Sequence, residues 1–331
     1  MRAIRLAARA VRLVRAQGPF ALARMALHQA HSAWGRLRPR HDFLRERPPT
    51  GDLVGMTTPE EQAFLYHHAK HDFRGGGAVV DLGCWLGSST LPLAAGLAEN
   101  RHPAAAGARV HAYDLFRWEE WMEDSLAGTA DAGTIAPGAS FLPLFERRLG
   151  AHRDRVEIVA GDLTELGWER GGPIAFLFND AAKSWALANA LLRSFYPALT
   201  PGSSLLVEQD FAHFFTPWVH LIHWRLREAF EPVVHVPFSG SMVFRVRRQV
   251  AHPTGSRDLG FADFGEEEIE AAFARSLALV EPPMRPNVWA ARVMLEVHRG
   301  DRHRARALLQ EAGRRGLRGL DLGKVRALLA G

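Results

Sequence analysis

The sequence is poor in cysteine, in lysine and in long apolar runs, and each shortage excludes a class of protein. Cys84 is the only cysteine, so no disulfide can form within the chain, which favours a reducing compartment. No uninterrupted apolar run approaches the ~20 residues that span a membrane. Because lysine occurs only at Lys70, Lys183 and Lys324, arginine carries most of the net charge of +5. We therefore expect a cytoplasmic protein without a membrane span.

The chain of 331 residues is 47% hydrophobic, which is enough for a buried core and excludes a mainly disordered protein. Breaks in composition divide it into four parts. We expect a basic helical region at 1–50, a central domain at 51–249, a polar linker at 250–263 and a helical tail at 264–331.

The N-terminal region is basic and patterned for a helix. Arg2, Arg5, Arg9 and Arg12 alternate with apolar residues, and no acidic residue precedes Asp42. A helix would gather these arginines along one side. Such a helix can lie on an anionic membrane or an acidic partner, or it can pack its apolar side on the rest of the protein. The arginines interrupt any apolar core of a secretory signal, which we reject.

The most informative segment runs from Val79 to Thr90. An apolar run ends in Asp81, two glycines follow in the pattern D-x-G-x-x-x-G, and hydroxyl residues then open a helix. This order predicts a strand, a tight turn and a helix N-terminus. An acid stands where the dinucleotide fingerprint G-x-G-x-x-G has its first glycine, and an anion there disfavours a pyrophosphate ligand.

Strand and helix patterns alternate through the central domain. We expect a doubly wound, seven-stranded, mostly parallel sheet with one antiparallel strand near its edge. The predicted strands are 78–82, 109–114, 156–162, 174–178, 205–207, 233–236 and 242–246.

Acidic residues end the first three predicted strands. They are Asp81, Asp114 and Asp162. In a doubly wound sheet the carboxyl ends of the strands meet at one crevice, so we expect these carboxylates to line one pocket. Carboxylates there can accept hydrogen bonds from the amino and hydroxyl groups of a nucleoside.

The segment around Asp81 resembles motif I of the class I S-adenosylmethionine (SAM)-dependent methyltransferases. The resemblance covers roughly residues 75–248 and implies that SAM is the cofactor. It implies that Asp81 holds the methionine ammonium, directly or through water, that Asp114 accepts the ribose hydroxyls, and that Asp162 accepts from the adenine amino group. The cofactor-binding residues implied in this way are Asp81, Gly83, Cys84, Gly87, Ser88, Asp114, Leu115, Asp162, Leu163 and Asp180.

The ends of the fourth and fifth strands resemble those of small-molecule O-methyltransferases of the catechol and macrocin types. In that family an acid after strand four and a pair after strand five hold Mg²⁺, a hard ion that prefers oxygen ligands. Family spacing places the ligands at Asp180, Glu208 and Gln209, and a shift of one residue replaces Glu208 by Asp210. Glu-Gln departs from the family pair, so metal binding stays open.

Two residues are candidates for the base that removes the acceptor proton. Lys183 follows Asp180 by three residues, as the catalytic lysine does in the catechol enzymes. Beside a metal and partly desolvated, this lysine would have a lowered pKa, which lets it take the hydroxyl proton. His213, after the fifth strand, is the rival. His220 and His223 are interpreted as ordinary helix residues rather than metal ligands. Five aromatic residues either wall the acceptor site or belong to the core: Trp118, Trp121, Phe211, Phe214 and Trp218.

The preferred function is therefore methylation of a hydroxyl on a small molecule or sugar. An RNA methyltransferase that uses the basic N-terminal region is one alternative, although no RNA-binding module is visible and we expect no nucleic-acid partner. A non-catalytic scaffold is the other. The tail resembles a single tetratricopeptide pair at 287–312, which predicts docking on the central domain or self-association into a homo-oligomer.

Overall fold

The computed structural model describes residues 41–331 except 52 and 256. The predicted arginine-rich helix lies outside the described residues. Among the described helices, none is long and apolar enough to cross a membrane.

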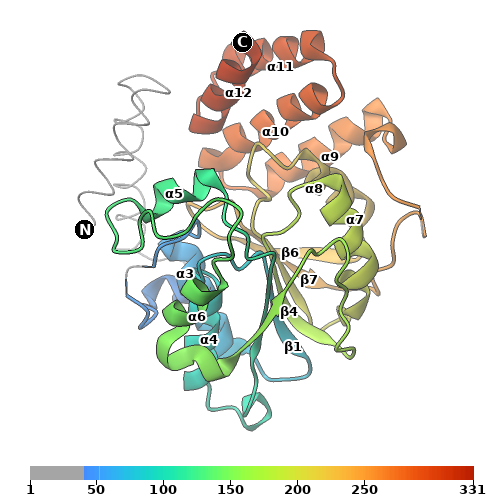
Figure 1. Ribbon diagram of the computed structural model, residues 1–331. Helices are drawn as coiled ribbons and strands as arrows, with labels where there is room; N and C mark the ends of the chain where they lie inside the picture. Colours follow the sequence, from blue (N-terminus) through green and yellow to red (C-terminus); the bar gives the residue numbers. More distant parts are fainter. Residues whose placement is uncertain (1–40, 52, 256) are drawn as a thin grey trace.

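A seven-stranded sheet forms the centre of the protein (Figure 1). Its order is β3-β2-β1-β4-β5-β7-β6. Neighbours from β3 to β5 pair in parallel, and β7 pairs antiparallel with both β5 and β6. This confirms the predicted doubly wound, mostly parallel sheet. The strands are β1 (Ala78–Leu82), β2 (Val110–Asp114), β3 (Val156–Ala160), β4 (Ile174–Asn179), β5 (Leu205–Glu208), β6 (Phe230–His235) and β7 (Met242–Val246).

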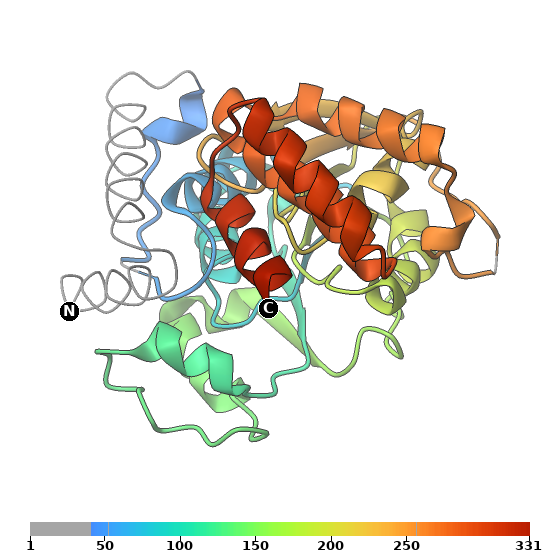
Figure 2. The ribbon, with the colours of Figure 1, turned by 90° about the horizontal axis from the view of Figure 1, so that it is seen from above.

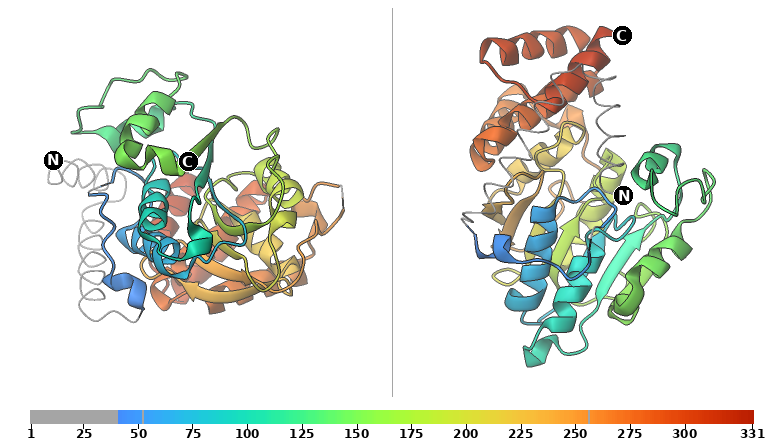
Figure 3. Two further views of the ribbon diagram at one scale, coloured as in Figure 1. Left: turned by 90° about the horizontal axis from the view of Figure 1, so that it is seen from below. Right: turned by 90° about the vertical axis from the view of Figure 1, so that its left-hand side faces the viewer.

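Helices cover both faces of the sheet (Figure 1). The helices α3, α4 and α6 lie on one side, and α7 and α8 lie on the other (Figure 3). The α-helices are α3 (Pro59–His67), α4 (Thr90–Glu99), α5 (Glu120–Leu126), α6 (Leu142–Leu149), α7 (Trp185–Ser194), α8 (Pro217–Arg225), α9 (Glu266–Leu279), α10 (Arg285–His298), α11 (Arg302–Arg314) and α12 (Leu320–Ala330). The short turns are η1 (Asp42–Arg45), η2 (His68–Asp72, a π-helical turn), η3 (Pro103–Ala105), η4 (Gly150–Arg155), η5 (Tyr196–Ala198), η6 (Phe261–Asp263) and η7 (Pro282–Met284).

Alternate residues of the central strands enter two different cores. In β4, Phe176 and Phe178 pack on the side of α3 and α4, whereas Leu177 packs on the side of α7 and α8. In β5, Leu206 and Val207 divide between the faces in the same way. Because side chains in a strand alternate with a period of two, both faces of these strands are buried. The same alternation decides which of the two helical layers each residue at the end of a strand faces.

The C-terminal helices continue the core on the α8 side. The buried side chains of Phe273 on α9 and Leu295 on α10 belong to the same apolar cluster as Leu206. Arg292, only 3% exposed, bonds Glu296 at 2.5 Å and Glu270 at 2.8 Å. Viewed from above, α11 and α12 lie over the rest of this region (Figure 2). The tail therefore packs on the central part of the chain, as one of the two predictions for it expected.

The turn after β1 generates a stability prediction. Gly83 has φ +81°, and a Cβ there would lie 2.9 Å from the backbone oxygen of Asp180. We expect Gly83→Ala to lower the free energy of unfolding by about 1–2 kcal/mol for the backbone conformation and by about 1–3 kcal/mol more for crowding. Gly107→Ala is the matched control, since φ is +76° and the space around it is open. Urea unfolding that gives equal losses for both variants would contradict the crowding at Gly83.

Candidate functional site

The first predicted site residue, Asp81, supports the turn from beneath. Its side chain is fully buried and accepts hydrogen bonds from Ser89 Oγ at 2.9 Å and Thr90 Oγ1 at 2.6 Å. Burial raises the pKa of this carboxyl to about 7. Asp81 therefore joins the end of β1 to the start of α4 and fixes the path of the chain between them.

Backbone bonds join this turn to its neighbouring strands. Gly83 N donates to Tyr113 O of β2 at 2.9 Å, and Asp180 N, after β4, donates to Leu82 O at 2.9 Å. Gly87 has φ +85°, which suits glycine. The predicted cofactor residues Cys84 and Ser88 are both buried, and burial raises the pKa of the Cys84 thiol. Both side chains therefore lie on the buried side of the turn.

Asp114, Leu115 and Asp162 lie together at the carboxyl ends of β2 and β3. Asp114 accepts from Trp85 N at 2.8 Å and Phe116 N at 2.9 Å, and burial raises its pKa. Gly161 N donates to Asp114 O at 3.0 Å, which brings the two strand ends together. The exposed Asp162 accepts from Thr164 N at 2.8 Å.

These donors and acceptors suit a nucleoside. The two oxygens of a carboxylate offer about four acceptor sites, so the bonded carboxylates of Asp114 and Asp162 keep capacity for hydroxyl or amino donors. Leu115 is 52% exposed beside them and offers an apolar surface, while Leu163 is buried in the core. The residue set at β2 and β3 thus fits the ribose and adenine of SAM.

A second group of charges follows β4 and β5. Lys183 Nζ hydrogen-bonds both Asp180 and Asp210, so its ammonium lies between the two carboxylates. The Gln209 amide nitrogen, assigned from the surrounding acceptors, donates to Asp180 Oδ1 at 2.8 Å and to Asp210 Oδ1 at 2.7 Å. Four residues from two strand ends therefore form one hydrogen-bonded cluster, which we call the charge cluster: Asp180, Lys183, Gln209 and Asp210.

The charge cluster corrects one expectation. Although desolvation lowers it, the pKa of Lys183 is raised, because two carboxylates stabilise the ammonium. The predicted lowering of the lysine pKa assumed a metal ion beside Lys183, and in this arrangement the pKa is raised instead. Burial raises the pKa of Asp180. Burial also acts to raise the pKa of Asp210, but Lys183, His213 and Lys324 together outweigh it, so that pKa is lowered. Lys183 is thus a fixed cation that keeps Asp210 ionised.

Glu208 lies apart from the charge cluster. It is 2% exposed and accepts from Asn179 Nδ2 at 2.7 Å and Tyr196 OH at 3.0 Å, and His223 Nε2 lies 3.1 Å from its Oε2. The structure therefore does not bring Glu208 together with Asp180 as the predicted metal site requires. The reason is strand parity, because Glu208 shares the face of Leu206 rather than that of Val207.

The remaining predicted ligands do not fit a Mg²⁺ site in this arrangement. A hard divalent ion needs oxygen ligands with free lone pairs. The carboxylates of Asp180 and Asp210 share the Lys183 ammonium, and Gln209 turns its amide nitrogen toward them. Since an ammonium already lies between the carboxylates, we derive no step through a metal at this position.

His213 lies beside the charge cluster and is partly accessible. Its side chain is 35% exposed, and its Nδ1 lies 4.0 Å from Asp210 Oδ1. His220 is fully buried against Phe273, and burial lowers its pKa to about 3, which agrees with an ordinary helix residue.

The five predicted acceptor-site aromatics divide between core and surface. Trp118, Phe211 and Trp218 are buried in the cores, so they do not wall an open site. Trp121 is 52% exposed, and its ring lies 5.6 Å from that of Trp85. Phe214 is half-buried against the tail.

Sequence reasoning missed Glu61 on α3. Its backbone N–H donates to Thr58 Oγ1 at 3.2 Å, while its side chain accepts from Thr58 N at 2.6 Å and Ser241 Oγ at 2.5 Å. Burial raises its pKa to about 7, and the charge of Asp210 contributes. No motif links Glu61 to the strand ends, and only the fold brings it near the charge cluster.

A cavity of about 530 Å³ lies beside the first turn. Leu86 and Leu91, on either side of Gly87, line it together with Arg148 and His152. It opens toward α6 and η4, and none of the strand-end carboxylates lines it. The strand-end site is therefore built from side chains at the sheet edge and not from this cavity.

Comparisons with known proteins found similarity in structure only. The sequence matches no protein-family model, and no curated protein matches it. A calicheamicin methyltransferase is 16% identical with a TM-score of 0.42, over 66% of this chain and 91% of that one. A methyltransferase from Geobacter sulfurreducens is 16% identical with a TM-score of 0.38, over 66% and 96%. A 23S rRNA methyltransferase is 18% identical with a TM-score of 0.33, over 71% and 87%.

Asp81 generates a pH prediction. Its pKa is about 7 in the fold against 3.8 for the free side chain. Between pH 3.8 and pH 7, Asp81 keeps its proton in the folded protein and loses it in the unfolded chain. The contribution of Asp81 to the free energy of unfolding therefore falls as pH rises through this range. Asp81→Asn does not titrate. Its free energy of unfolding relative to wild type should therefore rise by on the order of 2 kcal/mol from pH 5 to pH 7. Urea unfolding at both pH values checks this, and a constant difference would contradict it.

Proposed function

We propose that this protein is a SAM-dependent methyltransferase that acts on a hydroxyl of a small molecule. The proposal rests on the positions of Asp114 and Asp162 at neighbouring strand ends. They lie beside the turn after β1, and this turn contacts Asp180 of the charge cluster. Gly83 packs on the Asp180 backbone, so the nucleoside-type acceptors and the charge cluster border one edge of the sheet. That edge is where doubly wound folds bind ligands.

In this proposal the β2 and β3 ends hold the nucleoside. Asp114 accepts the ribose hydroxyls, Asp162 accepts the adenine amino group, and Leu115 contacts the ring. Asp81 acts by fixing the turn, because its carboxylate is fully buried and already bonded to Ser89 and Thr90. The methionine ammonium then finds its acceptors at the turn backbone or through water.

His213 is the proposed base. In the structure its Nδ1 accepts from Phe215 N at 3.4 Å and lies 4.0 Å from Asp210 Oδ1. When the imidazole turns so that Nδ1–H donates to Asp210, the Nε2 lone pair is left for the acceptor hydroxyl. SAM supplies a sulfonium methyl, which passes to the acceptor oxygen as the carbon–sulfur bond breaks, leaving S-adenosylhomocysteine. The hydroxyl proton goes to His213, and the resulting imidazolium is stabilised by Asp210. Lys183 is a positioning residue that keeps Asp210 ionised.

Calorimetric titration of SAM tests cofactor binding. We expect Asp162→Ala and Asp114→Ala each to weaken binding by about 10–100-fold, the cost of losing a hydrogen bond to a charged group. Asp154→Ala, an exposed acid in η4, is the control and should bind as wild type does. The titration is run once with Mg²⁺ and once with EDTA, and we expect equal affinity in both. No binding in either buffer would overturn the proposal.

Turnover tests the role of His213. Release of S-adenosylhomocysteine is measured against a panel of phenols, catechols and sugars. We expect His213→Ala to lower the rate by about 10²–10⁴-fold, as for loss of a general base, with SAM affinity unchanged. His303→Ala, exposed on α11, is the control.

Two outcomes would redirect this assignment. An unchanged rate in His213→Ala would exclude the histidine as base. Turnover on ribosomal RNA alone, with binding that weakens steeply with salt, would favour the RNA methyltransferase instead.

A further inference from the structure

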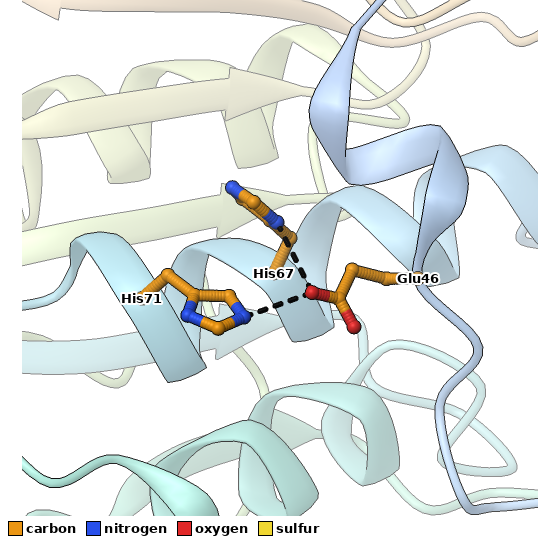
Figure 4. Close-up of side chains that lie close together, drawn as sticks. All are labelled: Glu46, His67 and His71. Atoms are coloured by element: carbon orange, nitrogen blue, oxygen red, sulfur yellow. Dashed lines mark hydrogen bonds and ion pairs between the residues drawn. The ribbon is translucent and has the colours of Figure 1, made fainter. Parts of the chain in front are cut away.

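A second group of polar side chains lies on the outer side of α3, away from the strand-end site. Figure 4 shows one carboxylate oxygen of Glu46 facing both His67 and His71. Glu46 Oε1 is 2.8 Å from His71 Nε2 and 3.6 Å from His67 Nδ1. One ligand atom from each of the three residues lies within 4.8 Å of the others. In the part of the chain that the structure describes, this is the one His, Cys, Asp and Glu group that meets this criterion.

Local structure fixes all three residues. His67 ends α3 and His71 lies one turn later in η2, and residues four apart share a face of a helix. Glu46 follows η1, which is held against α3 by buried Phe43, whose ring meets the Phe64 ring edge-on at 5.3 Å. The approach of Glu46 to the two histidines is thus set by packing and not by a free surface chain.

One atom in this group is left unexplained by protein contacts. The Nδ1 of His67 is buried and makes no hydrogen bond to any described residue, although it faces Glu46. A buried polar atom without a partner costs free energy, so a missing partner is indicated. The other ring nitrogen, Nε2, lies 3.9 Å from Asp72 Oδ2, which is too long for a hydrogen bond but places a carboxylate on the far side of the imidazole.

We propose that Glu46, His67 and His71 bind one zinc ion, with water as a fourth ligand. Two imidazoles and one carboxylate are a zinc-type donor set, whereas Mg²⁺ and Ca²⁺ prefer oxygen ligands alone. Tetrahedral ligands about 2.0–2.1 Å from zinc are about 3.3 Å apart. The observed separations from Glu46 Oε1, 2.8 and 3.6 Å, bracket this value. His67 Nδ1 gains the partner that it lacks.

The bound ion fixes the segment after η1 to the helix that leads into the sheet. From η2 the chain passes through 73–77 to the start of β1 at Ala78. The site is therefore nearer the amino end of β1, and Asp81 lies at the other end of the strand. Zinc here is structural, and its presence is independent of the proposed methyl transfer.

Titration of zinc into the full chain, purified without a histidine tag and stripped with EDTA, tests the proposal. We expect one Zn²⁺ per chain by calorimetry, and a visible absorption band when Co²⁺ replaces it. His71→Ala and Glu46→Gln should each weaken binding by more than the 10–100-fold typical of an outer partner. His303→Ala is the matched control and should bind as wild type does.

Thermal unfolding separates loss of the site from loss of the fold. Each variant without metal should melt cooperatively near the wild-type temperature, since the side chain of His71 is 44% exposed. Zinc should raise the melting temperature of wild type and of His303→Ala but not of His71→Ala, because only a ligand that binds the folded state stabilises it. Absence of stoichiometric binding, or unchanged affinity in both ligand variants, would overturn the proposal.

Discussion

The candidate site depends on the buried hydrogen bonds that Asp81 accepts from the hydroxyls of Ser89 and Thr90. They fix where the chain leaves β1 and where α4 begins. Gly83 then lies against the backbone of Asp180, with its N–H bonded to Tyr113. One turn thus locks the ends of β1, β2 and β4 relative to one another. Asp114 ends β2 and Asp180 follows β4. The same turn therefore sets the distance between the proposed nucleoside-binding carboxylates and the charge cluster.

Lys183 is the cation that bonds the acids at this sheet edge. Glu61, Asp180 and Asp210 lie near one another, and Lys183 bonds two of them. Three ionised carboxylates in a partly buried region would repel one another, and their pKa values therefore differ. The pKa values of Glu61 and Asp180 are raised while that of Asp210 is lowered. The carboxylate nearest His213 is therefore the one held ionised, which is what a base of the His–Asp type requires.

The sequence predicted the sheet well because its signals are local. Apolar runs ending in Asp81 and Asp114 located β1 and β2, and alternation with helical patterns gave the parallel order. The orientation of Glu208 could also have been predicted from the sequence. Side chains alternate along a strand, so Glu208 points to the face opposite Val207 and away from the charge cluster. The raised pKa of Lys183 had only part of its signal in the local sequence. Asp180, three residues before it, raises this pKa most, but Asp210 is 27 residues away, and only the pairing of β4 with β5 brings it to Lys183.

The C-terminal helices bear on the same edge of the sheet. Asn287 of α10 donates to Ala212 O at 3.2 Å, and Lys324 of α12 lies 4.9 Å from the Phe214 ring centroid. Ala212 and Phe214 flank His213, so the tail holds the loop that carries the proposed base. Lys324 also helps to lower the pKa of Asp210. Buried residues of α9 and α10 also pack in the same apolar cluster as β5, the strand that precedes this loop. The loop that carries the proposed base is therefore held jointly by the sheet and the tail, whereas the proposed nucleoside acceptors Asp114 and Asp162 lie at the ends of β2 and β3 and are held there by the turn after β1.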